Sequence, residues 1–324
     1  IEASQADLGI EMVLRLFCRS GLTAVFEEVR EHIDELPGEA RQMLAVAPAY
    51  LHAIDPVIEF LQGRNPSLAL LLARPGFLPQ GPRFSAQTAR TASARSLSDQ
   101  DRAKRFATLY LEDLADLVQA TISPHFALSR YAEHIARAAS SFQTVIDAVA
   151  APPMLTDRFM LESLWEHLER VNPALVCLTV PFPGNLYGAF RIAHSIKSRR
   201  PDIAIALGGG YANTELRRLA DSRVFDYVDY VTLDEGERPL LSLIEHLAGT
   251  RPRTRLCRTF YRDKDRVVFT NDTSDREFGM DEIGCPTYSG LALDRYLTIL
   301  DSTNPMHRLW SEGHWNKLTV AHGC

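Results

Sequence analysis

The residues of this chain best suited to bind a ligand lie in three short loops, at 181–185, 208–213 and 234–237. Each loop follows a short apolar run and precedes a helical pattern, which predicts that each run is a buried parallel strand. The ligands of parallel sheets bind at the carboxyl ends of the strands. We therefore expect a binding site at this edge of the sheet.

The three loops offer different chemical groups. Prolines stiffen the first loop, and Gly184 lets its backbone approach a ligand beside the free amides of the next helix. The triple glycine of the second loop suits a flat or bulky ligand, with Tyr211 lying along it and Asn213 capping the following helix. The third loop places carboxylates at the mouth of the site. The candidate binding residues are Pro181, Phe182, Gly184, Asn185, Gly208, Gly209, Gly210, Tyr211, Asn213, Asp234, Glu235 and Gly236.

A phosphate site is a weaker interpretation of the same loops. The glycines at 208–210 do not fit Gly-x-Gly-x-x-Gly, and the chain has no Gly-Lys-Ser/Thr motif. The acidic third loop also disfavours a polyphosphate. A simpler alternative is that the glycines only permit tight turns.

The other elements must position these loops. Helical patterns run over 11–19, 23–35, 38–61 and 99–122, with Pro48 and Pro56 expected to break the third. Two further helices are predicted from Ser129 and Thr156 as N-caps, and a long loop at 76–95 interrupts the helical region. A helix at 239–247 precedes a β-hairpin at 257–271 that turns at 263–265. We expect the helical region to be an insertion packed on an α/β core.

Composition narrows the classes of partner. The chain has 324 residues, 46% hydrophobic content and a net charge of −6, without a long basic run, which argues against a nucleic-acid partner. No apolar stretch reaches the roughly 18 residues of a membrane span, and no signal peptide is recognisable, so we expect no membrane partner and a cytoplasmic location. Five cysteines without a Cys-x-x-Cys pair argue against a disulfide framework. Cys177, in mid-strand, is expected to be a buried, inert thiol.

Residues 175–237 resemble the cobalamin-binding domain that precedes the barrel of many radical SAM enzymes. The matching features are the Pro-x-Pro-Gly-Asn loop, Gly-Gly-Gly-Tyr-Ala-Asn where the family often has Gly-Gly-x-x-Ala-Thr, and Asp-Glu-Gly-Glu where it often has Gly-Glu-Gly-Glu. The segment 318–324 resembles the first barrel strand, which leads into the Cys-x-x-x-Cys-x-x-Cys motif. On this resemblance Cys324 is a metal ligand, the first thiolate of a 4Fe–4S cluster.

The resemblance implies a doubly wound, mostly parallel, Rossmann-like α/β fold with a large helical insertion and the start of a barrel domain. The implied parts are 1–37, the first part of the α/β domain, with its leading strand before Ile1; 38–171, the insertion; 172–250, the cobalamin-binding-like core; 251–290, a hairpin and linker; and 291–324, the start of the barrel. Within the first part, the stretch 5–11 resembles the second strand and following helix of the domain. The sequence is thus expected to be a piece of a longer protein, inactive alone.

The resemblance also implies an activity. The cluster, supplied by an electron donor, would cleave S-adenosylmethionine for radical chemistry such as methyl transfer on an unidentified small-molecule or peptide substrate. No Asp-x-His-x-x-Gly motif is present, so the cobalamin would be bound without a histidine ligand (His-off). The alternatives are a non-catalytic corrinoid-binding module, a cobalamin-like domain that has lost its ligand, and a nucleotide-binding α/β enzyme such as a glycosyltransferase.

Overall fold

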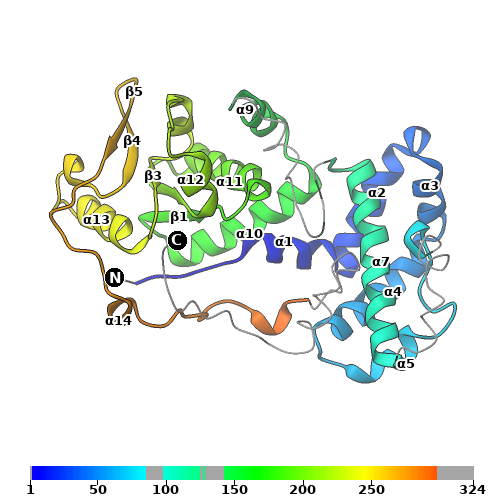
Figure 1. Ribbon diagram of the computed structural model, residues 1–324. Coiled ribbons are helices and arrows are strands. Elements are labelled where there is room, and N and C mark those ends of the chain that lie inside the picture. The colour runs from blue at the N-terminus through cyan, green and yellow to red at the C-terminus, as the bar shows by residue number, and fades with distance from the viewer. Residues whose placement is uncertain (1, 85–97, 125, 127, 129–141, 298–324) are drawn as a thin grey trace. The chain divides into compact units, whose positions relative to one another are not determined.

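The computed structural model describes residues 2–84, 98–124, 126, 128 and 142–297. The chain forms two compact units (Figure 1). The first comprises Ile1–Gly9 and His125–Leu291, and the second comprises Ile10–Pro124 and Ala292–Cys324. The region 38–171, predicted to be one helical insertion, therefore contributes to both units.

The first unit is built on a five-stranded sheet in the order β1-β2-β3-β4-β5. The first three strands are parallel and the last two are antiparallel, which confirms the predicted parallel run and hairpin. The strands are β1 (Leu175–Thr179), β2 (Ala204–Gly208), β3 (Tyr230–Thr232), β4 (Thr259–Asp263) and β5 (Arg266–Thr270). The chain is thus α/β. Within the described residues the strands follow chain order, and the reversal of order that defines a doubly wound sheet is not among them.

The predicted strand at the start of the chain is wrong. Residues 2–7 form no strand, and helix α1 (Leu8–Leu16) begins directly after them. The side chain of Gln5 instead donates hydrogen bonds to the carbonyl oxygens of Thr287 and Ser289, at 2.9 and 2.8 Å. This segment is therefore held against 287–289 by a side chain.

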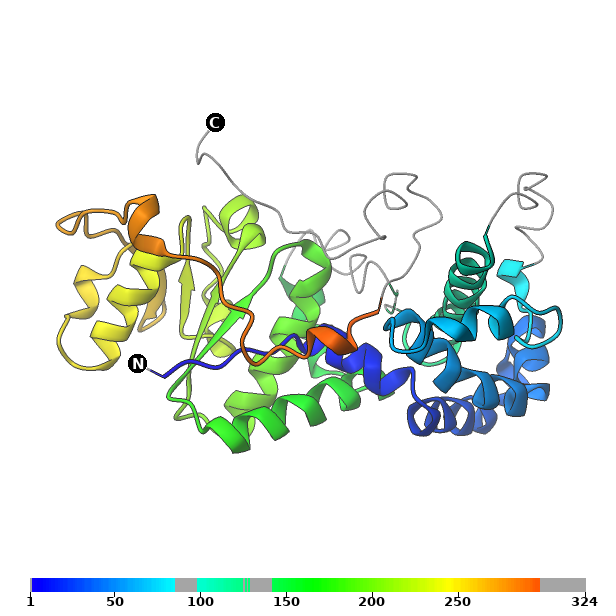
Figure 2. The same cartoon turned by 90° about the horizontal axis from the view of Figure 1, so that it is seen from below.

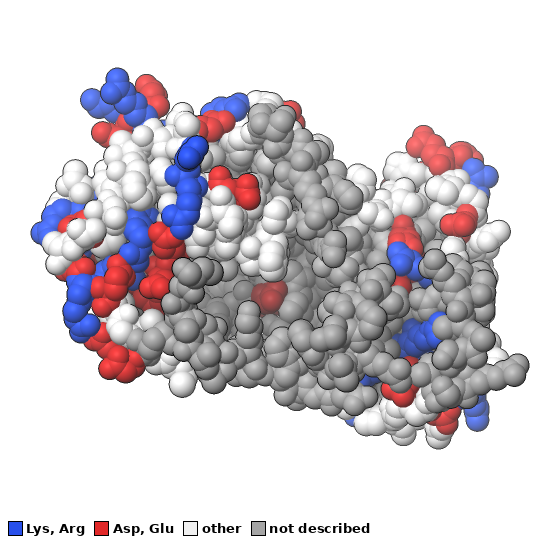
Figure 3. Space-filling model, viewed as in Figure 1, with Lys and Arg blue, Asp and Glu red and all other residues white. Residues whose placement is uncertain are grey.

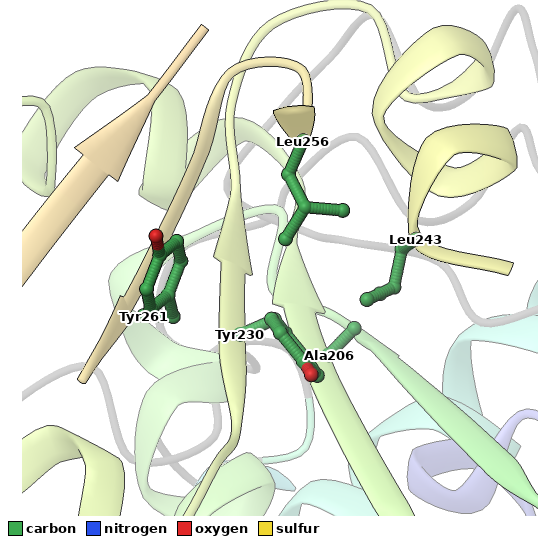
Figure 4. Close-up of a cluster of buried hydrophobic side chains, with 5 residues drawn as sticks. All are labelled: Ala206, Tyr230, Leu243, Leu256 and Tyr261. Atoms are coloured by element: carbon green, nitrogen blue, oxygen red, sulfur yellow. The ribbon is translucent and has the colours of Figure 1, made fainter. Parts of the chain in front are cut away.

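Helices surround the sheet. In the described part of this unit they are α9 (Gln143–Ala150), α10 (Leu155–Val171), α11 (Leu186–Arg199), α12 (Gly210–Glu215), α13 (Glu237–Leu247) and α14 (Met280–Ile283), with 3-10 turns at Pro183–Asn185, Ser222–Asp226 and Arg253–Arg255. α10 and α11 lie side by side (Figure 2) and are joined by the indole N–H of Trp165, which donates to Ser195 Oγ at 3.1 Å. On the sheet, Ala206, Tyr230 and Tyr261 occupy one row across β2, β3 and β4. Leu243 of α13 and Leu256 pack on this row (Figure 4).

The edge strand β1 is less covered than its apolar sequence predicts. Cys177 is exposed, so the expectation of a buried thiol is wrong. Its row partner on β2, Ala206, is buried beneath the cluster that includes Leu243, whereas β1 forms the edge of the sheet in the described part of the chain. A strand at a sheet edge is covered from one side less easily than a central strand.

A buried ion pair fixes α9 to α10 and α11. Arg191, 3% exposed, donates to the carbonyl oxygens of Val149 (2.7 Å) and Ala151 (2.9 Å), which lie at the end of α9. The hydroxyl of Tyr187 donates to Asp157 at 2.7 Å, and Asp157 in turn lies 3.5 Å from Arg191. These bonds satisfy carbonyl groups that a helix end leaves free.

The predicted N-cap of α10 is also wrong. The helix begins at Leu155, so Thr156 lies inside its first turn and is buried. The cap is supplied from the third position instead, where the Asp157 carboxylate accepts the backbone N–H of Met154 at 3.1 Å. The start of the helix predicted from Ser129 lies outside the described residues, and its later part is helical, as α9.

The second unit is helical. It contains most of α1 and also α2 (Arg19–Glu31), α3 (Gly38–Ala45), α4 (Ala47–Leu61), α5 (Ala69–Leu72) and α7 (Asp99–Thr121), with 3-10 turns at Ile33–Glu35, Pro66–Leu68 and Leu293–Arg295. The break between α3 and α4 falls at Val46, and α4 continues through Pro56. Only part of the predicted interruption is therefore confirmed.

Buried polar contacts tie this unit together. Tyr110 donates to the carbonyl oxygen of Tyr50 at 2.6 Å, and their rings stack. Asp113 accepts the backbone N–H groups of Gly81 (3.0 Å) and Arg83 (2.9 Å), and burial raises its pKa to about 6. The helix α7 thereby anchors the described end of the long predicted loop.

No single helix of the described residues has the length and apolar composition of a membrane span. The pair α3 and α4 meets both criteria only when taken together, across a bend of 76°.

Candidate functional site

The structure brings the three predicted loops to one edge of the sheet. Thr179 at the end of β1 is in register with Gly208 at the end of β2, and Leu207 is in register with Val231 of β3. The residues that follow these strands therefore begin at the same level. The predicted convergence of the loops is confirmed.

The first loop presents its side chains to solvent. Phe182 is 68% exposed, and Pro181 and Asn185 are exposed as well. Gly184 is buried in the 3-10 turn that leads into α11. Asn185 occupies the N-cap position of α11, and its exposed side chain makes no capping hydrogen bond. The exposed phenyl ring of Phe182 gives this edge a small apolar surface.

The glycines of the second loop have a structural cause that the sequence did not predict. Gly209 has φ of +100°, which only glycine adopts readily, and a β-carbon there would lie 2.8 Å from the carbonyl oxygen of Val180. A β-carbon on Gly210 would lie 2.7 Å from the carbonyl oxygen of Pro181, and one on Gly208 would lie 2.9 Å from Oγ1 of Thr232. The close approach that the glycines permit is therefore to neighbouring protein.

Backbone hydrogen bonds lock the first and second loops together. The N–H of Val180 donates to the carbonyl oxygen of Gly208 at 2.8 Å, and the N–H of Tyr211 donates to that of Val180 at 2.9 Å. Tyr211 is half-buried, and this burial, together with the nearby Glu215 carboxylate, raises its pKa. The two loops thus form one rigid unit, with Phe182 projecting from it.

Asn213 was predicted to cap a helix, and this prediction is wrong. α12 begins at Gly210 with Gly209 as its N-cap, which places Asn213 inside the helix. Its side-chain oxygen accepts the backbone N–H of Asp234 at 2.6 Å, and its amide nitrogen donates to the Asp234 carbonyl at 3.5 Å. Asn213 therefore joins the second loop to the third.

Asp234 has a backbone conformation that glycine adopts readily. Its φ is +61°, in the left-handed region that aspartate tolerates better than most residues. Its carboxylate forms an ion pair with Arg217, whose Nε also donates to the carbonyl oxygen of Asn213 at 2.7 Å. Asp234 is thus held in a left-handed conformation beside Arg217.

The rest of the third loop is exposed. The side chains of Glu235 and Glu237 reach solvent, and Glu237 lies in the first turn of α13, where a negative charge suits the helix dipole. Gly236 has φ of −73°, and a β-carbon there would meet nothing within 4 Å, so the fold does not require this glycine. Arg258 donates to the carbonyl oxygen of Glu235 at 3.2 Å and ties the loop to β4.

Sequence reasoning missed Arg217 and Arg258, which hold the third loop. Arg217 lies just past the end of α12, four residues after Asn213, and its guanidinium reaches back to the Asn213 carbonyl oxygen. Arg258 follows α13 in the chain, directly before β4. Only the antiparallel pairing of β3 with β4 brings it to the third loop.

The edge can bind a ligand by packing and by hydrogen bonding. Its exposed groups are a phenyl ring, a carboxamide, backbone and carboxylates. None of the three loops contains a histidine or cysteine. Among the residues that the structure describes, no group of three or more histidine, cysteine, aspartate or glutamate side chains could hold a metal ion. Cys324, the predicted cluster ligand, lies outside the described residues.

Comparisons of this chain with protein-family models, with curated proteins and with solved structures return no match.

Proposed function

We propose that this chain is the cofactor-binding part of a cytoplasmic radical SAM enzyme that uses cobalamin, a 4Fe–4S cluster and S-adenosylmethionine. The proposed substrate is a small molecule or a peptide, and an electron donor reduces the cluster. The observation that carries the proposal is the edge formed by the three loops, because the three sequence features of the resemblance are joined there by direct hydrogen bonds.

The residues at this edge fit a corrinoid bound without a protein ligand to cobalt. The exposed Phe182 and the half-buried Tyr211 offer aromatic surface to a broad ring, and the uncapped Asn185 offers an amide to its polar rim. The absence of histidine from all three loops agrees with the His-off mode. When bound, cobalamin supplies a methyl group for transfer, and the residues of this chain hold and orient it.

The left-handed Asp234 supports the same proposal at the point where the sequence departs from the family. A glycine is favoured there by φ of +61°, and aspartate adopts that conformation at small cost. The departure from Gly-Glu-Gly-Glu is therefore compatible with the loop shape that the resemblance implies. In the proposed enzyme Cys324 is the first cluster ligand, followed in the longer protein by cysteines at the Cys-x-x-x-Cys-x-x-Cys spacing.

The binding step can be tested on the chain itself. We expect the protein incubated with hydroxocobalamin to retain it through desalting, as measured by visible absorbance. Replacing the exposed ring in Phe182→Ala should weaken retention roughly tenfold, because an aromatic side chain that buries its face on a ligand contributes on the order of 1.5 kcal/mol.

Phe269→Ala is the matched control, because this ring is also exposed (47%) but lies on β5, which β4 separates from β3. It should bind as the unchanged chain does. A protein that retains no cobalamin, or equal losses in the two variants, would contradict the cobalamin assignment. The cluster is tested separately: a longer protein that includes the predicted cysteines should bind iron and sulfide under anaerobic reconstitution, and Cys324→Ala should abolish this.

One observation favours the second candidate, a domain that keeps the loops without the ligand. The spaces beside Gly208, Gly209 and Gly210 are filled by Thr232, Val180 and Pro181 of the same protein. Tight turns alone can thus account for the triple glycine. The cobalamin-retention experiment separates the two candidates, since the second predicts a colourless protein.

A further inference from the structure

A cavity of about 260 Å³ lies at the other end of the same sheet. It opens where β3 begins, whereas the three loops lie where β1, β2 and β3 end. β4 runs antiparallel to β3, so its late residues reach this end of the sheet. The lining residues are Phe225, Val228, Asp229, Tyr230, His246, Arg253 and Arg262.

Two of the charged groups in the wall already have partners. Asp229 accepts from Lys197 Nζ at 2.6 Å and from the backbone N–H of Ile205 at 2.7 Å, so its charge is neutralised. Arg262 forms an ion pair with Asp226 and donates to the carbonyl oxygen of Phe225. Neither group leaves a net charge for a ligand.

Arg253 is different. Within the described part of the chain, no carboxylate lies at salt-bridge distance from its guanidinium, and its buried Nε has no hydrogen-bond acceptor. A buried N–H group without an acceptor is uncommon in native proteins. Such a donor beside a cavity points to an acceptor supplied from outside.

The position of this guanidinium is fixed before any ligand arrives. Its central carbon lies 4.0 Å from the ring centre of Tyr261 and 5.8 Å from that of Tyr230, and one of its amino groups donates to the carbonyl oxygen of Arg262 at 2.9 Å. The two tyrosines are the neighbours on β3 and β4 seen in Figure 4. Stacking on aromatic faces keeps the planar fork of arginine oriented for an oxyanion.

His246 adds a second polar group to the wall. Its Nδ1 lies 2.9 Å from the carbonyl oxygen of Arg251, and because a carbonyl only accepts, Nδ1 carries the hydrogen. The ring meets Tyr230 edge-on. With the hydrogen on Nδ1, the other ring nitrogen of the neutral ring, Nε2, is a hydrogen-bond acceptor.

The wider surface does not explain the unpaired cation. Figure 3 shows basic and acidic side chains intermixed over the part of this unit that contains α13, β4 and β5. Ion pairs such as Arg251 with Glu245 and Arg255 with Asp272 account for this mixture. Arg253, which lies between these arginines in sequence, stands out from its neighbours.

We propose that this cavity binds a small phosphate, either inorganic phosphate or a compact phosphate monoester, with the Arg253 fork as its main donor. The volume lies just below the ~300 Å³ at which pockets for drug-sized ligands begin, so a nucleotide would not be enclosed. Arginine forks match the oxygens of phosphate in pairs. This phosphate site does not depend on the proposed cobalamin function, and each proposal is tested by its own experiment.

The test is calorimetric titration of the full chain with inorganic phosphate, with ethyl phosphate and with malonate, a dicarboxylate of similar size, in chloride buffer. We expect saturable binding of a phosphate and weaker binding of malonate. Arg253→Gln should weaken phosphate binding at least tenfold, because it removes a charged, paired hydrogen bond. Tighter binding of ethyl phosphate than of inorganic phosphate would identify a monoester as the ligand, and the reverse would identify the free ion.

Arg253→Lys keeps a cationic stem on the tyrosines but loses the fork, so it guards against a failure of the Gln variant to fold. It should weaken binding less than Arg253→Gln. Arg266→Gln, an exposed arginine on β5, is the matched control and should leave binding unchanged. Three results would overturn the proposal: no saturation up to about 10 mM phosphate, equal weakening in the Arg266 variant, or tighter binding of malonate than of either phosphate.

Discussion

The two ends of one sheet are organised by different means. At the carboxyl end, backbone groups join three loops, and the exposed surface is an aromatic ring with amides and carboxylates. At the amino end, long side chains from different segments converge on a cavity, and arginines supply the charge. The first end suits a broad ligand held by packing, and the second suits a small anion held by charge.

The difference follows from how each end is assembled. Parallel strands place their loops at one edge by topology alone, so short loops of glycine and asparagine suffice there. The amino end receives Arg262 only because β4 turns back antiparallel to β3, and Arg253 only because the 3-10 turn before β4 places it over two tyrosines. Long side chains bridge distances that the backbone at this end does not cover.

The largest effect should come from the close packing of loops at the carboxyl end. Gly209→Ala puts a β-carbon 2.8 Å from the Val180 carbonyl oxygen, at a φ of +100°. We expect a loss of about 3 kcal/mol of unfolding free energy, because strained backbone and a backbone clash add. Urea denaturation followed by the fluorescence of Trp165, which is in the same unit, measures it.

Gly236→Ala is the control within the same edge. Its φ is −73° and a β-carbon there would meet nothing within 4 Å, so stability should stay within about 0.5 kcal/mol or rise slightly. If both variants lost the same stability, the glycines would not differ in role, and the packed-loop description of this end would be wrong.

At the amino end, the corresponding test removes a side chain that neutralises charge. Lys197→Met takes away the ammonium that donates to Asp229 at 2.6 Å and to the carbonyl oxygen of Ile203 at 2.9 Å. We expect a loss of about 2 kcal/mol, the usual contribution of hydrogen bonds to a charged group that is partly buried. The same urea titration applies.

The ion pair Arg200–Asp202 offers the comparison. It lies just before β2, as Ile203 does, but both of its side chains are exposed. Arg200→Gln should leave the midpoint of unfolding unchanged, since exposed ion pairs contribute little. A loss in Arg200→Gln as large as that in Lys197→Met would show that position near the strand, and not burial of the pair, decides the effect.

The two ends also differ in how well the sequence predicts them. Apolar runs ending in glycine, proline and asparagine predicted β1, β2, β3 and the meeting of their loops, because parallel topology needs only short-range patterns. The role of Gly209 was not predicted, since its φ and its contact with Val180 depend on how two loops dock. The cavity at Arg253 was not predicted, since its lining comes from separate segments.

At the start of the chain, the sequence predicted an element that the structure does not contain. The stretch 5–11 was predicted to be a strand and helix of the sheet by resemblance, but residues 2–7 form no strand. A short segment carries too little pattern to decide between pairing in a sheet and a side-chain anchor such as that of Gln5. The exposure of Cys177 was missed for a related reason, because a strand's position at the edge of a sheet is not written in its own residues.

The smallest expected effect concerns Asp234, where the carboxyl end uses a charged side chain. Asp234→Gly removes the strain of an aspartate in the left-handed conformation but also removes the ion pair with Arg217. Both side chains of that pair are partly exposed. The two changes should nearly cancel, within about 0.5 kcal/mol. Asp234→Ala loses the pair and keeps the β-carbon at φ of +61°, so it should cost about 1 kcal/mol. Urea denaturation ranks the three proteins, and cobalamin retention should be equal in the Gly variant and the unchanged chain. An Ala variant as stable as the Gly variant would mean that backbone conformation does not govern this loop, and charge would then be as important at this end as at the other.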